Sequence, residues 1–308
     1  MRALLIVNPK ATATTERGRD ILARALGSEL KLDVAMTQRR GHAVELARQA
    51  VHDDIEVVVT LGGDGTVNEV VNGLLADGPR QDLPALAVVP GGSANVFTRT
   101  LGLPRDPVEA TSEVLAALRE GRRRSLGLGL ADDRWFTFCA GVGFDAEVVH
   151  EVETHRREGG RATPAAYVRT AIRHFYLGTD RRRPALRLVR PGQPAEDGLF
   201  LAIVSNSSPW TYLGSRPVVP SPSASFDCGL DVVALRRMGT PIALRSVRRI
   251  LHARGGVPRG RAVLSLHDLD DFTVSAVRPV AVQVDGDYLG TGQEVRFRAV
   301  PDALCVIA

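Results

Sequence analysis

A buried-strand pattern that runs directly into glycines constrains the fold of this chain more than any other feature. Residues 57–61 are β-branched and apolar, and residues 62–66 read Gly-Gly-Asp-Gly-Thr before a helical spacing of apolar residues. Glycines at a strand-to-helix turn let backbone N–H groups approach a phosphate, and the helix N-terminus adds partial positive charge. The alternative is a plain tight turn in which Asp64 or Thr66 caps the helix.

A second glycine loop favours the phosphate interpretation. The apolar run 85–89 ends in the loop 90–95, Pro-Gly-Gly-Ser-Ala-Asn, and a helix is expected to follow. In a parallel sheet such loops converge at one edge, where the loop 8–12 after the first strand also lies. We therefore predict a nucleoside triphosphate site. It is not a Walker P-loop, because neither Lys10 nor Lys31 is followed by Ser or Thr.

The hydrophobic pattern predicts two domains of different class. In the first part, strand-like runs alternate with helical ones, which predicts a doubly wound α/β domain with a parallel sheet, placed at 1–125. Short strands joined by Gly, Pro and Asp turns then predict an antiparallel β-sandwich domain at 126–295, and a tail of about 296–308 is expected to pack back on the first domain. The expected strands are 3–7, 32–36, 55–61, 85–89, 126–130, 135–139, 185–189, 199–204, 230–235, 261–266, 271–276, 281–284 and 294–298, and the expected helices are 16–26, 42–51, 66–75, 145–155 and 164–177.

Composition limits the classes of partner. The 308 residues are 44% hydrophobic and 24% charged, a soluble globular balance, and no apolar run approaches the roughly 20 residues of a spanning helix. No signal peptide is expected, so we predict a cytoplasmic protein, with a peripheral position at the inner face of the membrane. The three cysteines have no CxxC spacing, which predicts neither a disulfide frame nor a zinc site. The net charge of +4 comes largely from arginine and suits phosphates or acidic lipids, or is simply a solvated surface; no nucleic-acid motif accompanies it.

Short motifs recur in a fixed order from residue 4 to about residue 290. They are Asn8-Pro9, Gly41-His42-Ala43, Gly62-Gly63-Asp64-Gly65-Thr66 with Asn68-Glu69, Gly91-Gly92-Ser93-Ala94-Asn95, Gly141-Val142-Gly143-Phe144-Asp145-Ala146 and Asp285-Gly286-Asp287. This order resembles the diacylglycerol kinase catalytic family, which includes bacterial soluble lipid kinases, sphingosine kinases and ceramide kinases. The Gly-Gly-Asp-Gly-Thr block is shared with NAD kinases and phosphofructokinases, whereas the blocks at 41–43 and 285–287 narrow the resemblance to lipid kinases.

The resemblance implies an ATP site with Mg²⁺ in the first domain and a catalytic acid from the second. The implied nucleotide-binding residues are Asn8, Pro9, Lys10, Ala11, Thr12, Thr37, Gly62, Gly63, Asp64, Gly65, Thr66, Asn68, Glu69, Gly91, Gly92, Ser93 and Asn95. Asp64 is the candidate for Mg²⁺, through phosphates or water, or for orienting the hydroxyl. Asp285 is the first choice for the base and Asp287 the second. The other interpretation of Asp-Gly is a hairpin turn, and both can hold.

Two positions depart from the family pattern. Val96 stands where the second glycine loop commonly continues Asn-Asp-Phe, which removes one acidic group. In the soluble bacterial enzymes a structural Mg²⁺ lies near an Asp-Asp-Gly-Leu stretch, and this chain has Asp227-Cys228-Gly229-Leu230 instead. Thiols are poor Mg²⁺ ligands. We expect this second metal site to be absent, unless a backbone shift brings Asp227 into it.

The expected reaction is phosphoryl transfer from ATP to a lipid hydroxyl in the cleft between the domains. Diacylglycerol is the leading acceptor, and a sphingoid base, another lipid alcohol or a polyprenol-like acceptor stays open. The alternatives are a kinase for a soluble substrate, like an NAD kinase, and a non-catalytic nucleotide or lipid sensor, which Val96, Cys228 and Asp287 would favour. Edge strands of the β domain leave a homodimer open.

A segment at 156–183 combines arginines with aromatic and apolar residues such as Tyr167, Ile172 and Phe175. One interpretation is that this segment lies on an anionic bilayer with its apolar face inward. The competing interpretation is an ordinary amphipathic helix that packs on the β domain.

Overall fold

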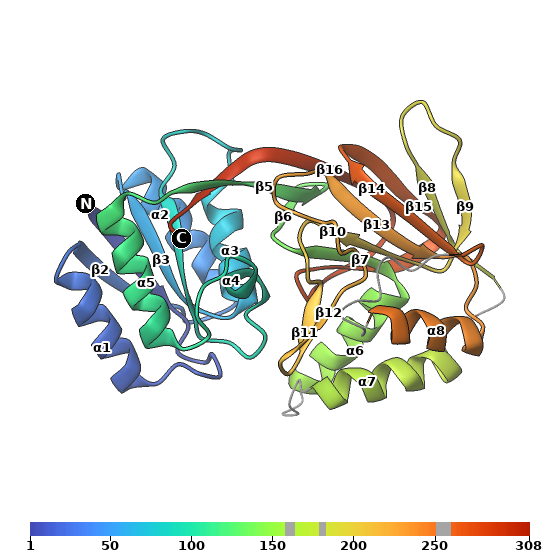
Figure 1. Cartoon of the computed structure of the whole chain (residues 1–308), viewed down its shortest axis with the longest axis horizontal. Coiled ribbons are helices and arrows are strands. Elements are labelled where there is room, and N and C mark those ends of the chain that lie inside the picture. Colours follow the sequence, from blue (N-terminus) through green and yellow to red (C-terminus); the bar gives the residue numbers. More distant parts are fainter. Residues whose placement is uncertain (158–163, 179–182, 251–259) are drawn as a thin grey trace. The chain divides into compact units, whose positions relative to one another are not determined.

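The computed structural model describes residues 1–157, 164–178, 183–250 and 260–308. Within these residues the chain divides into two compact units (Figure 1). Unit 1 is Met1–Leu128 together with Pro301–Ala308, and unit 2 is Gly129–Val300. Strands β5 (Arg124–Ala131) and β16 (Asp287–Val306) contribute residues to both units.

Unit 1 contains the predicted parallel sheet. Its strands are β1 (Arg2–Val7), β2 (Lys31–Met36), β3 (Val57–Gly62) and β4 (Ala85–Pro90). They lie in the order β4-β3-β1-β2, and every pair is parallel. Strands β3 and β4 are buried along their whole length, because helices cover both faces.

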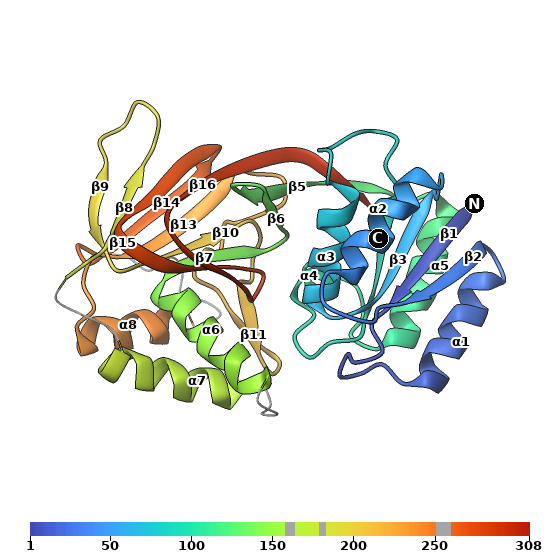
Figure 2. The same ribbon diagram turned by 180° about the vertical axis from the view of Figure 1, so that it is seen from behind.

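The helices of unit 1 form two layers, one on each face of this sheet. They are α1 (Glu16–Gly27), α2 (His42–His52), α3 (Asp64–Leu74), α4 (Val96–Thr100) and α5 (Pro107–Glu120). Helices α1 and α5 pack on one face, where Leu26 and Val114 share a core with Leu5, Val59 and Ala87. Helices α2 and α3 pack on each other over the opposite face (Figures 1 and 2). The doubly wound α/β prediction is confirmed.

Helix α5 lies outside the predicted elements, although its boundaries are marked in the sequence. The Asp106 side chain accepts hydrogen bonds from the N–H groups of Val108 and Glu109, Pro107 occupies the first turn, and Gly121 ends the helix in a left-handed conformation. These are ordinary cap residues.

The C-terminal part of β16 completes the sheet of unit 1. Val306 pairs in parallel with Leu86 of β4, and the Ile307 N–H donates to the Leu86 carbonyl at 2.9 Å. Leu304, Val306 and Ile307 are buried. The edge of β4 is therefore covered by residues that follow all of unit 2 in the sequence.

Unit 2 is built on antiparallel strands. They are β6 (Arg134–Phe136), β7 (Cys139–Gly143), β8 (Leu186–Val189), β9 (Glu196–Leu199), β10 (Leu201–Ser205), β13 (Leu230–Leu235), β14 (Val263–Leu269) and β15 (Asp271–Val284), with the hairpin of β11 (Thr211–Leu213) and β12 (Arg216–Val218). One layer has the order β14-β13-β10-β7-β15-β16.

The long hairpin of β15 and β16 passes from this layer into a second one. Residues 282–284 of β15 pair with β7, whereas residues 273–276 pair with β8, and the register against β16 shifts between Ser275 and Val280. Strands β9, β5 and β6 extend the second layer. Both layers share one core, in which Phe272 and Phe297 lie with Val142 and Val204. The β-sandwich prediction is confirmed.

The helical elements of unit 2 are α6 (Phe144–Arg157), α7 (Pro164–Arg173), the π-helix η1 (His174–Gly178) and α8 (Thr240–Ile250). Helix α6 packs on β7, β10 and β15. Helix α8 and the hairpin β11–β12 were not predicted, and the runs 271–276 and 281–284 form the single strand β15. Of the described helices, none combines the length and the apolar character needed to cross a bilayer.

Candidate active site

Two glycine loops of unit 1 pack backbone against backbone at the carboxyl end of the sheet. The Gly91 N–H donates to the Gly62 carbonyl at 2.7 Å, and the Ala13 N–H donates to the Gly91 carbonyl at 2.8 Å. A Cβ on Gly92 would lie 2.6 Å from the Gly63 Cα atom, closer than real Cβ contacts. The absence of side chains at these positions is therefore what brings the loops after β1, β3 and β4 together, as the sequence predicted.

Helix α3 begins at this junction with an open N-terminus. Its N-cap is Gly63, a residue without a side chain to cap the first turn. Gly63, Asp64 and Gly65 are half-buried, whereas Thr66 is buried and its Oγ1 accepts from Asn8 Nδ2 at 3.1 Å. Backbone N–H groups of a first turn carry partial positive charge, so this end of α3 suits a phosphate.

Asp64 and Asn95 fix the second glycine loop. Asp64 Oδ1 accepts from the Phe97 N–H at 3.1 Å, at the start of α4. Asn95 has a left-handed backbone with φ 47°; its side chain accepts from the Gly92 N–H at 2.9 Å and donates to the Gly92 carbonyl at 2.8 Å. Asn95 therefore holds the loop in shape and leaves Ser93 exposed beside it.

Glu69 and Asn68 have framework contacts in this structure. The Glu69 carboxylate accepts from the N–H groups of Gly41 and Ala43, at 2.9 and 3.2 Å, at the N-terminus of α2. Asn68 is fully buried and accepts from Asn72 Nδ2. The blocks at 41–43 and 68–69 are therefore joined in the fold by the Glu69 carboxylate.

The other predicted nucleotide residues lie at the same edge of the sheet. The Lys10 N–H donates to Asn8 Oδ1 at 3.0 Å, and the Thr37 N–H donates to the Val7 carbonyl at 2.8 Å. Pro9, Lys10 and Thr12 are exposed, and Ala11 and Thr37 are half-buried. Whether these residues contact a nucleotide stays a prediction.

The acidic block of unit 2 forms a tight hairpin. Asp285 and Gly286 have φ values of 48° and 82° and connect Val284 of β15 to Asp287 of β16, which pair with each other. Positive φ at both central residues is the geometry that favours Asp-Gly. The hairpin interpretation of this block is confirmed.

The Asp285 carboxylate accepts at least four hydrogen bonds. Oδ2 accepts from the Thr137 N–H at 2.7 Å and the Thr137 hydroxyl at 2.9 Å, and Oδ1 accepts from the N–H groups of Phe138 and Cys139 at 3.0 and 3.1 Å. The residue is only 6% exposed. These bonds replace ladder pairing at 137–138 and break the expected strand 135–139 into β6 and β7. Sequence reasoning missed Thr137, because nothing near it in the sequence points to residue 285.

Asp287 has a more accessible position. It is half-buried at the first residue of β16. The next residue, Tyr288, places its ring against His150 of α6 with a centroid separation of 4.1 Å. Of the two candidate bases, Asp287 is the more exposed.

A buried carboxyl group supports the same hairpin. Asp145 Oδ2 accepts from Gln283 Nε2 at 2.9 Å, and Gln283 Oε1 accepts from the Gly286 N–H at 2.9 Å. A Cβ on Gly141 would lie 1.9 Å from Asp145 Oδ2. The glycine-rich stretch 141–146 thus makes room for a carboxyl group. Burial raises the pKa of Asp145 to about 6, and the Gln283 hydrogen bond partly opposes this.

We expect this raised pKa to make stability depend on pH. Between about pH 4 and 6 the folded protein keeps a proton on Asp145 that the unfolded chain, with an ordinary pKa of 3.8, releases. The contribution of Asp145 to stability therefore falls as pH rises through this window. We compare the unfolding free energy of Asp145→Asn with that of wild type by denaturant titration. The difference should shift in favour of the variant by about 2–3 kcal/mol as the pH rises from 4 to 7.

The matched control is Asp77→Asn, at an exposed aspartate. Its unfolding free energy relative to wild type should not change with pH. An Asp145→Asn difference that stays constant from pH 4 to 7 would contradict the assignment of the proton to Asp145.

The stretch around Asp227 does not form a cation site in the described residues. Asp227 is exposed, and its Oδ2 lies 3.3 Å from the Ser225 hydroxyl. The neighbouring Asp231 Oδ1 lies 2.6 Å from His267 Nδ1 and accepts from the Asp268 N–H at 3.1 Å. No group of three or more His, Cys, Asp or Glu side chains converges in the described part of the chain. These residues do not fit a structural Mg²⁺, and we derive no role for one.

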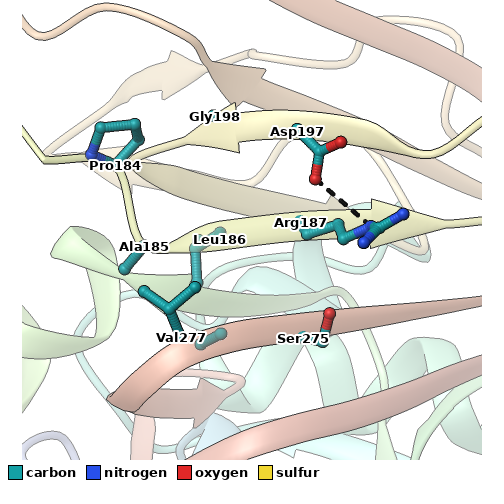
Figure 3. Close-up of a pocket in the computed structure, with 9 residues that line it drawn as sticks. Pro184, Ala185, Leu186, Arg187, Asp197, Gly198, Ser275 and Val277 are labelled. Atoms are coloured by element: carbon teal, nitrogen blue, oxygen red, sulfur yellow. Dashed lines mark ion pairs between the residues drawn. The ribbon is translucent and has the colours of Figure 1, made fainter.

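A pocket of about 300 Å³ lies elsewhere in unit 2, between β8, β9 and β15 (Figure 3). The ion pair of Arg187 and Asp197, at 3.2 Å, is drawn across it, and Pro184, Leu186 and Val277 line it. None of the predicted site residues belongs to this pocket. It is therefore not a candidate for the catalytic centre.

Comparison with known proteins shows the family of this chain. The model of the diacylglycerol kinase catalytic domain matches residues 2–129. The diacylglycerol kinase of Staphylococcus carnosus (strain TM300) is 33% identical over 299 residues, which cover 94% of this chain and 89% of that relative. This chain belongs to the diacylglycerol kinase family. A relative named as a YegS-like lipid kinase, from Chromohalobacter salexigens, is 28% identical over 309 residues, covering 99% of this chain and 92% of that protein.

A solved structure shows the same fold. A diacylglycerol kinase from Bacillus anthracis str. Sterne matches with a TM-score of 0.71 and 19% sequence identity, over 99% of this chain and 96% of that one. As a member of the diacylglycerol kinase family, the protein is a lipid kinase, that is, a phosphotransferase with an alcohol acceptor. The predicted family and enzyme class are confirmed.

Proposed function

We propose that this diacylglycerol kinase family member transfers the γ-phosphoryl group of ATP to the hydroxyl of diacylglycerol or a closely related lipid alcohol, with Mg²⁺. One observation carries the proposal. The open N-terminus of α3 lies beside two glycine loops whose backbones touch, Gly92 against Gly63. Such a surface of backbone N–H groups without side chains suits the phosphates of a nucleotide.

Unit 1 binds the nucleotide in this proposal, through the loops after β1, β3 and β4. Mg²⁺ in kinases is usually held by one or two carboxylates together with phosphates and water, rather than by a cage of protein ligands. The half-buried Asp64 fits that pattern as a single carboxylate beside the open helix end. A Mg²⁺ ion held there would neutralise charge on the phosphates.

Unit 2 provides the lipid pocket and the base. We assign the base to Asp287, because the oxygens of Asp285 already accept hydrogen bonds from residues 137–139. The Asp287 carboxylate accepts the proton of the lipid hydroxyl. The hydroxyl oxygen bonds to the γ-phosphorus as the bond from that phosphorus to the β–γ bridging oxygen breaks, and ADP leaves. The products are ADP and a phosphorylated lipid, which for diacylglycerol is phosphatidic acid.

A labelling experiment tests the function. The protein is incubated with γ-labelled ATP, Mg²⁺ and mixed micelles that each contain diacylglycerol, a sphingoid base, a ceramide or a polyprenol, with NAD as a soluble acceptor. We expect label in phosphatidic acid, and none when Mg²⁺ is chelated. Label on NAD alone would contradict the lipid acceptor. Nucleotide binding without label on any acceptor would favour a sensor.

A further inference from the structure

Helices α7 and α8 of unit 2 expose apolar side chains together with arginines. On α7, Val168 and Ile172 are 46% and 56% exposed, and on α8, Leu244 and Val247 are 69% and 47% exposed. Tyr176, in η1 directly after α7, is 52% exposed. Large apolar side chains grouped on neighbouring turns are unusual on a free surface and mark an interaction site.

The inner face of α7 is already occupied by packing on α6. Ala166 of α7 is buried, and so is Phe175 of η1, whose ring meets the Phe144 ring of α6 edge-on at 6.3 Å. Val168 and Ile172 lie one helical turn apart, and both are exposed, as is Tyr176 in η1. Of the two interpretations of segment 156–183, packing on unit 2 describes one face of α7. The other face has exposed apolar side chains and stays available for a bilayer. Residues 158–163 and 179–182 of that segment lie outside the described residues.

The charge on helices α7 and α8 is positive, which favours an anionic partner. Neither α7 nor α8 contains an acidic residue, and α8 carries Arg245, Arg248 and Arg249. Among the described residues, no carboxylate lies within ion-pair distance of Arg169, Arg245 or Arg248, whereas Arg173 pairs with Glu151 at 3.2 Å. Both views place α7 and α8 next to each other on the side of unit 2 where α6 lies (Figures 1 and 2).

We infer that α7 and α8 form a docking surface for an anionic lipid bilayer, with the apolar side chains entering the interface and the arginines on the headgroups. Basic amphipathic helices bind bilayers in this way, and each arginine near an anionic surface strengthens the binding. The inference rests on the proposed function, because it names the surface on which the enzyme meets its lipid substrate.

Flotation with vesicles tests the surface without any need for turnover. The double variant Leu244→Ser/Arg245→Ala removes one apolar and one basic side chain from α8. Val277→Ser/Arg278→Ala is the matched control, because Val277 is 81% exposed in β15 and is also followed by an exposed arginine. With vesicles of phosphatidylcholine and phosphatidylglycerol, the α8 variant should partition about tenfold or more weakly than wild type, and the control like wild type.

A second helix variant and a second measurement distinguish a bilayer surface from an interface between two copies of the chain. Ile172→Ser/Arg169→Ala on α7 should behave like the α8 variant, and pure phosphatidylcholine vesicles should bind wild type weakly. Unchanged flotation of both helix variants, or an equal loss in the control, would overturn the inference. A third result would also overturn the inference: light scattering shows that the wild type is a dimer and that the α8 variant is not, while the α8 variant still floats like the wild type. The exposed face would then join two copies of the chain.

Kinase assays distinguish failure of docking from failure of the function. With a short-chain diacylglycerol that dissolves as a monomer, the α8 variant should turn over like wild type, and with substrate in vesicles it should be slower by the loss in partitioning. Equal rates on vesicles would overturn the inference. Wild type that floats through α7 and α8 but labels no lipid would support the docking surface and refute the proposed reaction.

Discussion

Replacing Asp287 with asparagine is expected to lower turnover of the lipid by about 10²- to 10⁴-fold, the usual contribution of a positioned general base. The amide is nearly isosteric with the carboxylate but does not take the proton of the lipid hydroxyl. Asp287 is half-buried at the end of a hairpin, so the fold should survive the change. The measurement is initial rates with γ-labelled ATP, together with denaturant unfolding of the same preparation.

The control for Asp287→Asn is Asp302→Asn. Asp302 is exposed in β16 and, like Asp285, has a positive φ of 49°. It lies in no part of the proposed machinery and should keep full activity. Retained turnover in Asp287→Asn would remove that residue from the chemistry and return Asp64 or Asp285 to consideration as the base.

Asp285→Asn should instead weaken the fold of unit 2, by about 2–4 kcal/mol of unfolding free energy. An amide keeps one acceptor oxygen, so at least one of the buried N–H groups of Thr137, Phe138 and Cys139 loses its partner. An unsatisfied buried donor costs about 1–3 kcal/mol, and bonds to a charged acceptor cost more. Asparagine tolerates the left-handed backbone of this position, so the turn itself adds little strain.

The two variants form a matched pair, because the same chemical change is made two residues apart. The unfolding free energy from denaturant titration should fall for Asp285→Asn and stay within about 1 kcal/mol of wild type for Asp287→Asn. The rate of lipid turnover should fall more in Asp287→Asn. If Asp285→Asn unfolds like wild type and is inactive, Asp285 acts in the chemistry and the assignment of the two roles is reversed.

The sequence predicted most of the fold because the buried elements carry strong periodic signals. The runs that became β3 and β4 are almost entirely apolar and are buried along their whole length, and the loops after them contain glycines where a side chain would not fit. Helix α8 was missed because Leu244 and Val247 are exposed, so its apolar residues do not mark a face buried in this unit. The bend in β15 was missed because it depends on pairing with two different strands.

The candidate site was predicted as a set of residues but not as a set of roles. Glycine loops can be recognised from the local sequence, because a close backbone approach requires glycine. The roles of the carboxylates cannot, because their hydrogen-bond partners are distant in sequence. The Glu69 carboxylate accepts hydrogen bonds from the N–H groups of residues 41 and 43, and the Asp285 carboxylate accepts them from the N–H groups of residues 137–139. Only the folded chain shows that these two acids stabilise loops.

The covered edge of β4 affects how the protein can be made and studied. Residues 301–307, which complete the sheet of unit 1, leave the ribosome only after all of unit 2 has been synthesised. Until then the nascent unit 1 presents an unpaired, apolar strand edge, which is a template for aggregation. A fragment 1–128 would retain that edge permanently. Biochemists who want the nucleotide unit by itself should therefore attach residues 301–308 through a linker instead of truncating the gene.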